Sequence, residues 1–330
     1  MSYYRIHGLF TLRSPLSHIG ESISTNTYLI QEPIIQPDGQ LAEVFCYNGN
    51  AIRGMWRDAA AAYMLDRLGA EGDAHARVPL DLFHLLFTGG RIGGDQSIDI
   101  EQARRIRASV PMLSMWGGGV GNQIMAGKLR ISNAYPLCLE AIPALPERWH
   151  IDAAQATYTG MTFEKSFSRM DDTKREDLRL YLPPAEGADL LDGPASGKKK
   201  AKRSGEVADQ MRMTTELVAA GTRLYTEVDV IDATEVELGA LVSAIHQWSR
   251  SPHIGGQANK GHGKVRLDYR IIDMDTGAEQ DFIRVTGDGP CRLAAPAEAA
   301  KSAYDAHLRR LYDEMLAEHK DEIRSLIGAL

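Results

Sequence analysis

The chain has 330 residues, enough to bury a large core and to form one elaborated domain or two. Its hydrophobic share of 44% and its charged share of 25% are ordinary for a soluble globular protein. The formal net charge of −7 argues against a protein coated with nucleic acid on every face, although a global sum leaves a local basic groove open.

The cysteines and histidines point to no disulfide framework and no dedicated metal site. Cys46, Cys138 and Cys291 are far apart and form no C-x-x-C pair. The ten histidines show neither H-x-x-x-H nor H-E-x-x-H spacing. The sequence has no signal peptide and no apolar run of roughly 18 residues, so we expect free thiols in a cytoplasmic protein without metal or cofactor.

Apolar residues at strand or helix spacing mark six elements. In chain order they are a strand over 3–12, a helix over about 50–68 capped by Asn50, a strand over 128–139, a strand over 223–231, a helix over 235–248 and a strand over 264–272. This β-α-β-β-α-β order predicts an α+β fold of the ferredoxin-like type, the topology of the RRM, whose open sheet receives single-stranded RNA. Topology alone assigns no function, because this fold hosts many chemistries.

Two long insertions and a terminal helix complete the chain. Residues 69–127 contain a short predicted helix over 80–87 and the loop GGRIGGDQ. Residues 140–221 join two strands that need only a hairpin turn, which predicts a two-armed projection with a mobile tip near 185–205. After Pro296, Tyr304, Leu308, Leu311 and Met315 recur at helical spacing. We expect this last helix to pack on its own domain, with a subunit contact as the alternative.

The glycine-rich stretches do not match standard nucleotide sites. Counting back from Gly263-Lys264, a P-loop requires glycine where Ala258 stands and Ser or Thr where Val265 stands. The run from Gly117 to Gly121 misses the dinucleotide spacing, because Asn122 occupies the last position. The remaining phosphate-rich partner is a polynucleotide.

Two groups of cations are candidates for phosphate contacts. Arg53 and Arg57 lie one turn apart at the start of the first predicted helix, where exposed amides favour an anion. The alternative is a solvated helix face that pairs with Asp58 or a loop acid. Lys264 and Arg266 share the outward face of the last strand with Arg270, which is either an ordinary solvent face or a backbone contact beside the glycines.

Three stretches resemble a known family. RSPLSHIGES at 13–22, YNGNAIRGMWRDA at 47–59 and PHIGGQANKGHGKVRL at 252–267 are similar to the three signature stretches of the RAMP superfamily of CRISPR proteins. Their order and the two insertions resemble the backbone (seven-family) subunit of CRISPR effector complexes, and SHIGES and NGNAIRG are most similar to its type IV member. The resemblance implies an RRM-like palm over 1–68, 128–139 and 222–295, helical fingers over 69–127, a thumb over 140–221 and a C-terminal helix over 296–330.

In that family, copies of the subunit stack head to tail along a guide RNA (crRNA), and each thumb crosses the guide–target duplex and flips out a base. The resemblance therefore implies further copies, other effector subunits and a target strand as partners. It also implies a target that is DNA rather than RNA, with a DinG-type helicase as a further partner. The implied RNA-binding residues are Arg13, Ser17, His18, Asn50, Arg53, Arg57, Gln257, Asn259, Lys260, His262, Lys264 and Arg266.

The predicted thumb carries apolar residues between cations, as a wedge into stacked bases requires. The candidate wedge and target contacts are Phe163, Lys165, Phe167, Arg169, Met170, Lys174, Arg175, Lys198, Lys199 and Lys200. We favour Phe167 and Met170 as the wedge. Alternatively, they pack the two strands of the projection against each other, with Met211 and Met213 on the returning strand. The polybasic run at 198–203 is either a solvated tip or a contact with target phosphates.

One departure from the family bears on catalysis. Target-cleaving type III members carry an acid in a segment that aligns with residues 29–35, and Gln31 stands in its place. A neutral amide cannot act as a general base, and Glu32, one residue later, points to the opposite face of a strand. We therefore expect a binding subunit that is not an enzyme. The alternatives are a RAMP ribonuclease, metal-dependent or metal-independent, that uses His18 or His262, and a scaffold that binds no nucleic acid.

Overall fold

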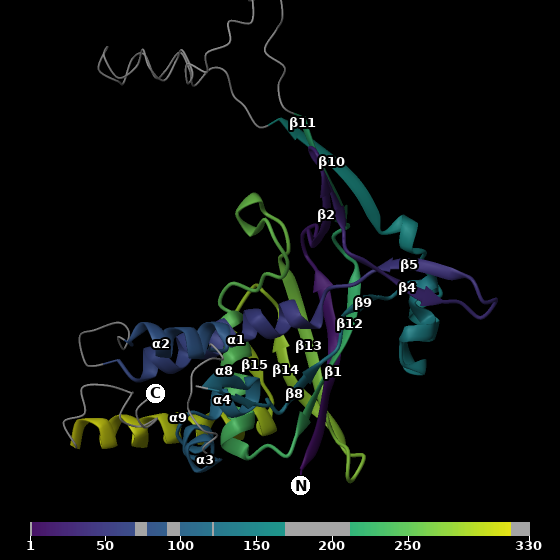
Figure 1. The fold of residues 1–330 in the computed structure, drawn as a ribbon. Helices are drawn as coiled ribbons and strands as arrows, with labels where there is room; N and C mark the ends of the chain where they lie inside the picture. Colours follow the sequence, from purple (N-terminus) through teal and green to yellow (C-terminus); the bar gives the residue numbers. More distant parts are fainter. Residues whose placement is uncertain (1, 70–77, 91–99, 121, 169–211, 318–330) are drawn as a thin grey trace, which may run out of the picture.

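The computed structural model describes residues 2–69, 78–90, 100–120, 122–168 and 212–317. The fold is α+β, as predicted, with a seven-stranded antiparallel sheet and helices gathered on one of its faces (Figure 1). No helix in these ranges is long and apolar enough to cross a membrane. Cys46, Cys138 and Cys291 are free thiols, the first two buried, and burial raises the pKa of both buried thiols to about 12.

The main sheet has the strand order β15-β14-β13-β1-β12-β8, with β9 beside β12. Its strands are β1 (Tyr3–Leu12), β8 (Leu129–Ile131), β9 (Tyr135–Pro136), β12 (Arg223–Ile231), β13 (Val265–Asp273), β14 (Glu279–Val285) and β15 (Arg292–Leu293). The register places Ile6 opposite both Val228 and Ile271, so the alternating apolar side chains of the three central strands meet on one face. The predicted strands over 3–12, 223–231 and 264–272 are confirmed.

The predicted strand over 128–139 is wrong in its middle and at its end, because β8 and β9 are separated and η2 (Leu139–Ala144) begins at Leu139. Ser132 still bonds Glu227 of β12, but Ala134 exchanges two backbone hydrogen bonds with Tyr47, at 2.8 and 2.9 Å. Asn133 then accepts a hydrogen bond from the Gly49 amide, 2.9 Å away. The strand divides into β8 and β9 because this linker serves the start of the first helix.

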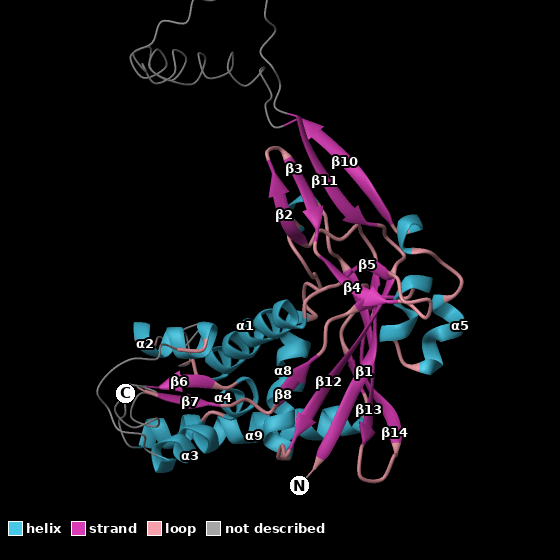
Figure 2. Cartoon of the chain, turned by 45° about the vertical axis from the view of Figure 1, so that its right-hand side comes forward, coloured by secondary structure: helices cyan, strands magenta, loops and turns pink. Residues whose placement is uncertain are grey.

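Helices α1 (Gly49–Arg67), α4 (Pro111–Trp116), α8 (Glu235–Trp248) and α9 (Ala295–Ala317) lie against the inner face of the sheet and against one another (Figures 1 and 2). Phe10 of β1 meets Trp248 and Tyr269 edge to face, with ring centroids 6.1 and 6.0 Å apart. A Cβ on Gly239 would lie 2.0 Å from the Ala300 carbonyl oxygen, so the close crossing of α8 and α9 requires glycine there. The predicted packing of the last helix on its own domain is confirmed.

The cap predicted at Asn50 is wrong. The N-cap of α1 is Asn48, which makes no side-chain capping bond, and Asn50 is an exposed residue of the first turn. The Asn133 side chain, which lies outside the helix, instead accepts a hydrogen bond from the Gly49 amide. In α8, by contrast, Thr234 and Glu237 form a local capping box, and the predicted helix over 235–248 is confirmed.

The insertion between α1 and β8 is mainly helical where it is described. It contains α2 (Leu80–Phe83), a π-helical turn η1 (His84–Thr88), α3 (Ile100–Ser109), α4 and a small hairpin of β6 (Gly118–Val120) and β7 (Gln123–Met125). The predicted helix over 80–87 is confirmed, although its second half is π-helical. Residues 91–96 of the predicted loop GGRIGGDQ lie outside the described residues.

Two smaller sheets project from the main sheet (Figure 2). The first, which we call the arm, has four strands in the order β10-β11-β3-β2. They are β2 (Ile19–Ile23), β3 (Asn26–Leu29), β10 (Thr162–Ser168) and β11 (Arg212–Val218). The second is a hairpin of β4 (Gln31–Ile35) and β5 (Leu41–Phe45). Between β9 and β10 the chain forms the short helical turns η2 (Leu139–Ala144), η3 (Glu147–Trp149), α5 (His150–Ala153) and η4 (Tyr158–Gly160).

Candidate nucleic-acid interface

The glycine loop, residues 252–264, folds back on itself between α8 and β13. His253 and Lys264 form a bridge, and the Ile254 amide donates to the Gly263 carbonyl oxygen over 2.9 Å. A Cβ on Gly263 would lie 2.0 Å from the Ile254 carbonyl oxygen, and both Gly255 and Gly263 have positive φ. These two glycines are required by the protein's own backbone. Gly261, also at positive φ, faces open space and leaves room for a ligand.

The three signature-like stretches, far apart in sequence, meet at this loop. The Gly256 amide donates to the Ser17 carbonyl oxygen over 2.8 Å, which joins the first stretch to the third. The Gly255 amide donates to the Tyr47 hydroxyl over 3.2 Å, which joins the third to the second. The Asn48 amide donates to His18 Nε2 over 3.4 Å and closes the triangle. We call this arrangement the junction.

Ser17 lies inside the junction, and His18 is half-buried beside it. The His18 ring packs edge to face on Tyr47, with centroids 4.7 Å apart, and burial lowers its pKa. Ser17 is fully buried, and its hydroxyl has no hydrogen-bond partner among the described residues. Both residues therefore shape the loop from beneath.

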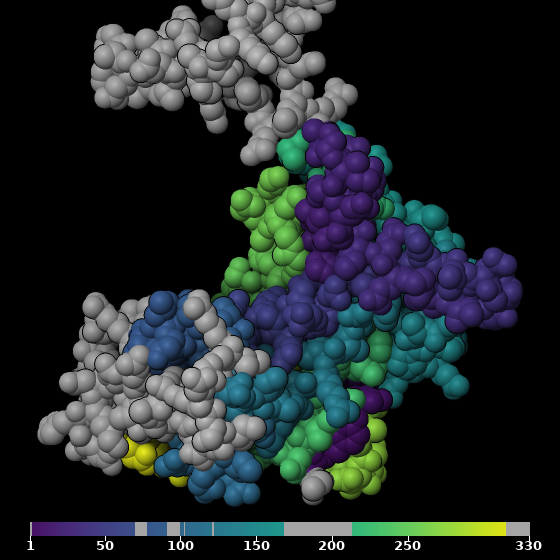
Figure 3. All heavy atoms as spheres, in the orientation of Figure 1, coloured from purple at the N-terminus to yellow at the C-terminus, as the bar shows by residue number. Residues whose placement is uncertain are grey.

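Lys260, Asn259 and Lys264 extend from the loop toward solvent. Asn259 and Lys260 are exposed, and Lys264 is half-buried. In the part of the chain that the structure describes, neither lysine forms an ion pair. Lys260 Nζ instead lies 4.4 Å from the centroid of the Phe167 ring, a cation–π contact between the loop and the arm. Figure 3 shows the loop, in green, beside the purple β2–β3 hairpin of the arm.

Gln257 and His262 frame the exposed tip of the loop. Gln257 adopts a left-handed conformation with φ of 61°. His262 is buried, and its pKa is lowered by that burial and by the charge of Lys165. Gln257 thus precedes the helical turn Ala258–Lys260, and His262 follows it.

Arg57 is enclosed by residues of the insertion between α1 and β8. Its side chain is 7% exposed and donates to the carbonyl oxygens of Leu86 and Leu85, each over 2.7 Å, and of Gly117 over 3.0 Å. Burial lowers its pKa to about 10. A solvated helix face is therefore wrong for Arg57, and the guanidinium anchors α1 to the insertion between α1 and β8.

Arg53, one turn earlier, also contacts the insertion between α1 and β8. It donates to the Trp116 carbonyl oxygen, and the Trp116 indole donates to the Arg53 carbonyl oxygen over 3.0 Å. Asn50 is the exposed polar residue at this end of α1. The phosphate contact predicted for these residues stays a prediction.

Ion pairs cover the outer face of the main sheet. Arg270 contacts Glu279 at 3.1 Å, and the same carboxylate contacts Arg148 at 2.9 Å and His7 at 3.0 Å. Trp149 packs near Tyr225, with ring centroids 6.2 Å apart, so residues of η3 cover part of this face. The predicted outward direction of Lys264, Arg266 and Arg270 agrees with the alternating burial of β13. On this face Arg266 and Arg270 form ion pairs with acids, and Lys264 forms none with the described residues.

The thumb candidates divide between described and undescribed residues. Phe163 is 39% exposed and lies opposite Leu217, and Phe167 lies opposite Met213 across the β10–β11 pair. Lys165 is exposed on the same strand. The remaining candidates lie outside the described residues, namely Arg169, Met170, Lys174, Arg175, Lys198, Lys199, Lys200 and Met211.

The two residues at or next to the position of the family's catalytic acid both form hydrogen bonds within the protein. Gln31 donates to the Tyr158 hydroxyl over 2.9 Å. The Glu32 carboxylate accepts from Asn133 over 2.8 Å and from the Tyr135 hydroxyl over 2.5 Å. Glu32 thereby holds the linker that supports the start of α1.

Three residues that complete the interface were not identified from sequence. Tyr47 links two stretches through its hydroxyl, Asn133 binds the first amide of α1, and Asp288 binds Arg13. Tyr47 belongs to the quoted second stretch, where the hydroxyl contact carries no local signal. Asn133 and Asp288 act across 84 and 275 residues of sequence, so no spacing rule reveals them.

No protein-family model matches the sequence, and no curated protein matches it. Among solved structures, the chain is similar to one described as "Type IV-B CRISPR Complex", with 18% sequence identity and a TM-score of 0.48. That match covers 81% of this chain and 90% of the other. A similarity at this level does not establish a shared function, so function must be argued from the residues themselves.

Proposed function

We propose that this protein binds a guide RNA as the backbone subunit of a CRISPR effector complex, with copies arranged head to tail along the guide. The junction carries the proposal. Three stretches that resemble family signatures are separated by dozens to hundreds of residues, yet hydrogen bonds of 2.8 to 3.4 Å connect them. In the proposed arrangement, β1, α1, β8, β12, α8 and β13 form the RRM-like palm, and β10 and β11 form the base of the thumb.

The chemistry of the interface favours recognition of a backbone rather than of bases. Lys260 and Lys264 offer ammonium groups without ion pairs to described residues, and Gly261 leaves space beside them. The outer sheet face, where an RRM stacks bases on aromatic side chains, is occupied by ion pairs and by Trp149. The guide is therefore held through phosphates at the glycine loop, independently of its sequence.

The protein presents the guide for pairing and does not cut the target. A general base needs a free carboxylate within hydrogen-bond reach of the hydroxyl that it deprotonates. Both oxygens of Glu32 already accept hydrogen bonds, and Gln31 is an amide. We propose DNA as the target, other effector subunits and a DinG-type helicase as partners, and the cytoplasm as the compartment.

The test combines binding with cleavage. Purified protein is mixed with labelled single-stranded RNAs of unrelated sequence, and the dissociation constant and the integrity of the RNA are measured with and without Mg²⁺. We expect similar affinities for all sequences and intact RNA in both conditions. Cleavage in either condition would favour the ribonuclease alternative, and failure to bind any RNA would favour the scaffold alternative.

A further inference from the structure

Two of the predicted RNA-binding arginines are already bound to one carboxylate. Asp288 lies in the loop between β14 and β15, and its Oδ1 accepts a hydrogen bond from Arg13 Nη1. Its Oδ2 lies 3.7 Å from Arg266 Nη2. Each carboxylate oxygen therefore contacts a different guanidinium, one from the segment after β1 and one from β13.

This loop continues the candidate interface. The Arg13 amide donates to the Lys264 carbonyl oxygen over 2.7 Å, so Arg13 is attached to the end of the glycine loop. The hydrogen bond from Arg13 lowers the pKa of Asp288, and the charges of Arg266 and Lys264 lower it further. Three predicted RNA-binding cations thus act on one acid, which is ionised at neutral pH.

The segment that carries Asp288 is exposed and flanked by glycines. The Asp288 side chain is 56% exposed. Gly287 has a φ of 74°, and a Cβ there would lie 3.2 Å from Arg13 Nη1, so the loop lies close against the arginine. Gly289 faces open space. Such a segment can leave the arginines without disturbing a packed core.

We propose that the Asp288 carboxylate occupies a phosphate subsite formed by Arg13 and Arg266, and that an RNA phosphodiester displaces it on binding. The inference rests on the proposed function and adds to it a subsite beside the glycine loop together with a built-in competitor. Carboxylate and phosphate oxygens accept the same charge-assisted hydrogen bonds from guanidinium groups, so either anion fits between the two arginines.

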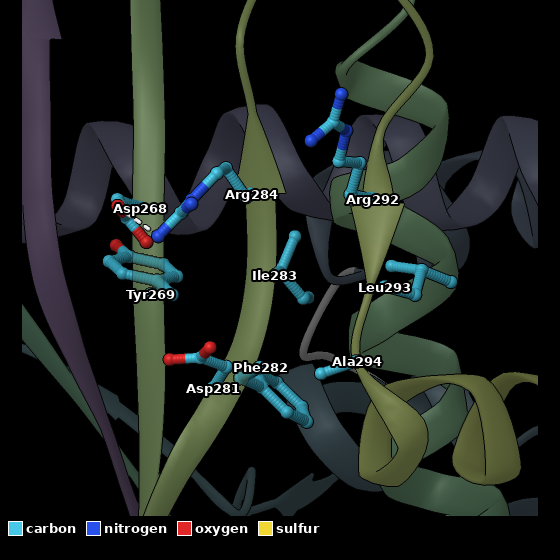
Figure 4. Close-up of a pocket in the computed structure, with 9 residues that line it drawn as sticks. All are labelled: Asp268, Tyr269, Asp281, Phe282, Ile283, Arg284, Arg292, Leu293 and Ala294. Atoms are coloured by element: carbon cyan, nitrogen blue, oxygen red, sulfur yellow. Dashed lines mark ion pairs between the residues drawn. The ribbon is translucent and has the colours of Figure 1, made fainter.

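A neighbouring ion pair supplies a matched control. Asp268 of β13 contacts Arg284 of β14 at 2.9 Å, and its side chain is 55% exposed, almost the same as Asp288. The pair lines a cavity of about 180 Å³ on the sheet, and Arg292 of β15 lines the same cavity (Figure 4). Replacing Asp268 removes the same charge and frees one arginine, but that arginine is outside the proposed subsite.

The experiment compares Asp288→Asn with Asp268→Asn for binding to one labelled single-stranded RNA across a range of salt concentrations. We expect D288N to bind several-fold more tightly than wild type and D268N to bind like wild type. The salt slope of D288N should be steeper by no more than about 0.7, because the subsite holds one phosphate and a single strand releases about 0.7 counterion per phosphate contact. Thermal unfolding of each variant serves as the check on folding.

A double variant assigns the effect to the arginines. Adding Arg13→Gln to D288N should abolish the gain in affinity, because the subsite then lacks one of its donors. Equal gains in D288N and D268N would mean a general charge effect and overturn the inference. If D288N binds RNA with the same affinity as wild type, the inference is also overturned. The proposed function would still stand in that case, because wild type binds RNA. A wild-type protein that binds no RNA would overturn both.

Discussion

Arg57 and Lys264 were both predicted to contact phosphate, yet they have opposite surroundings. Arg57 is buried and donates to three carbonyl oxygens, whereas Lys264 is half-exposed at the end of the glycine loop. Helical spacing placed Arg57 correctly on α1, but spacing cannot show that residues 85–86 and 117 return to cover it. We therefore expect the two side chains to affect different measurements.

Replacing Arg57 should destabilise the fold. Arg57→Met keeps the apolar stem but leaves the carbonyl oxygens of Leu85, Leu86 and Gly117 without their donor. Loss of buried partners should lower the free energy of unfolding by roughly 2–3 kcal/mol. Urea denaturation measures this, with Lys264→Met as the control that should stay within about 0.5 kcal/mol of wild type. Equal stability of the two variants would contradict the anchoring role of Arg57.

Replacing the lysines of the glycine loop should weaken RNA binding without destabilising the fold. Lys260→Gln and Lys264→Gln should each lower the slope of log affinity against log salt by about 0.7, because each removes one contact with a single-stranded backbone. The same loss should appear for every RNA sequence. Arg270→Gln is the control, because Arg270 is paired with Glu279 on the outer sheet face. A slope that these lysine variants leave unchanged would place both side chains away from the guide.

At the scale of elements, the sequence was informative wherever the signal was local. β1, β12 and α8 begin and end where alternation and helical spacing of apolar residues place them. The β2–β3 hairpin was missed because β2 is exposed along its whole length and shows no buried face. Its partner β3 pairs with β11, which lies 187 residues later. The junction depends on equally distant backbone contacts, so the sequence identified its three stretches but not their geometry.

The arm should act on the guide–target duplex through Phe167. Its ring contacts Lys260, so the loop proposed to bind the guide and the strand that carries the proposed wedge are in contact. One pair per subunit should be open and chemically reactive at a constant spacing, because an inserted apolar side chain unstacks neighbouring bases. Phe167→Ala, alone or with Met170→Ala, should abolish this periodic reactivity and leave the guide bound.

Phe163→Ala tests the other described wedge candidate, which lies four residues earlier on β10. If Phe167 only packs the two arm strands together, the duplex of the unmodified complex will be uniformly protected, and both variants will behave alike.

At the scale of the whole molecule, lowering the pH should destabilise the folded state at pH values above those at which carboxylates become protonated. Burial lowers the pKa of His7, His18, His246 and His262 below the ordinary value of 6.5. The unfolded chain therefore binds more protons than the folded one as the pH falls through 6.5, and the free energy of unfolding falls with it. Urea denaturation between about pH 7.5 and 5.5 should show a steady loss of stability. Constant or rising stability in this window would mean that these histidines are charged in the folded state.

The measurement that tests the central proposal most directly is the mass of the particles that the protein forms on guide RNAs of increasing length. If copies stack head to tail along the guide, the particle mass should rise in equal steps of one protein chain as the RNA lengthens. The double variant with Lys260→Gln and Lys264→Gln should form particles of the same mass only at a lower salt concentration. A particle that keeps the mass of one protein chain on long RNA would contradict the backbone role.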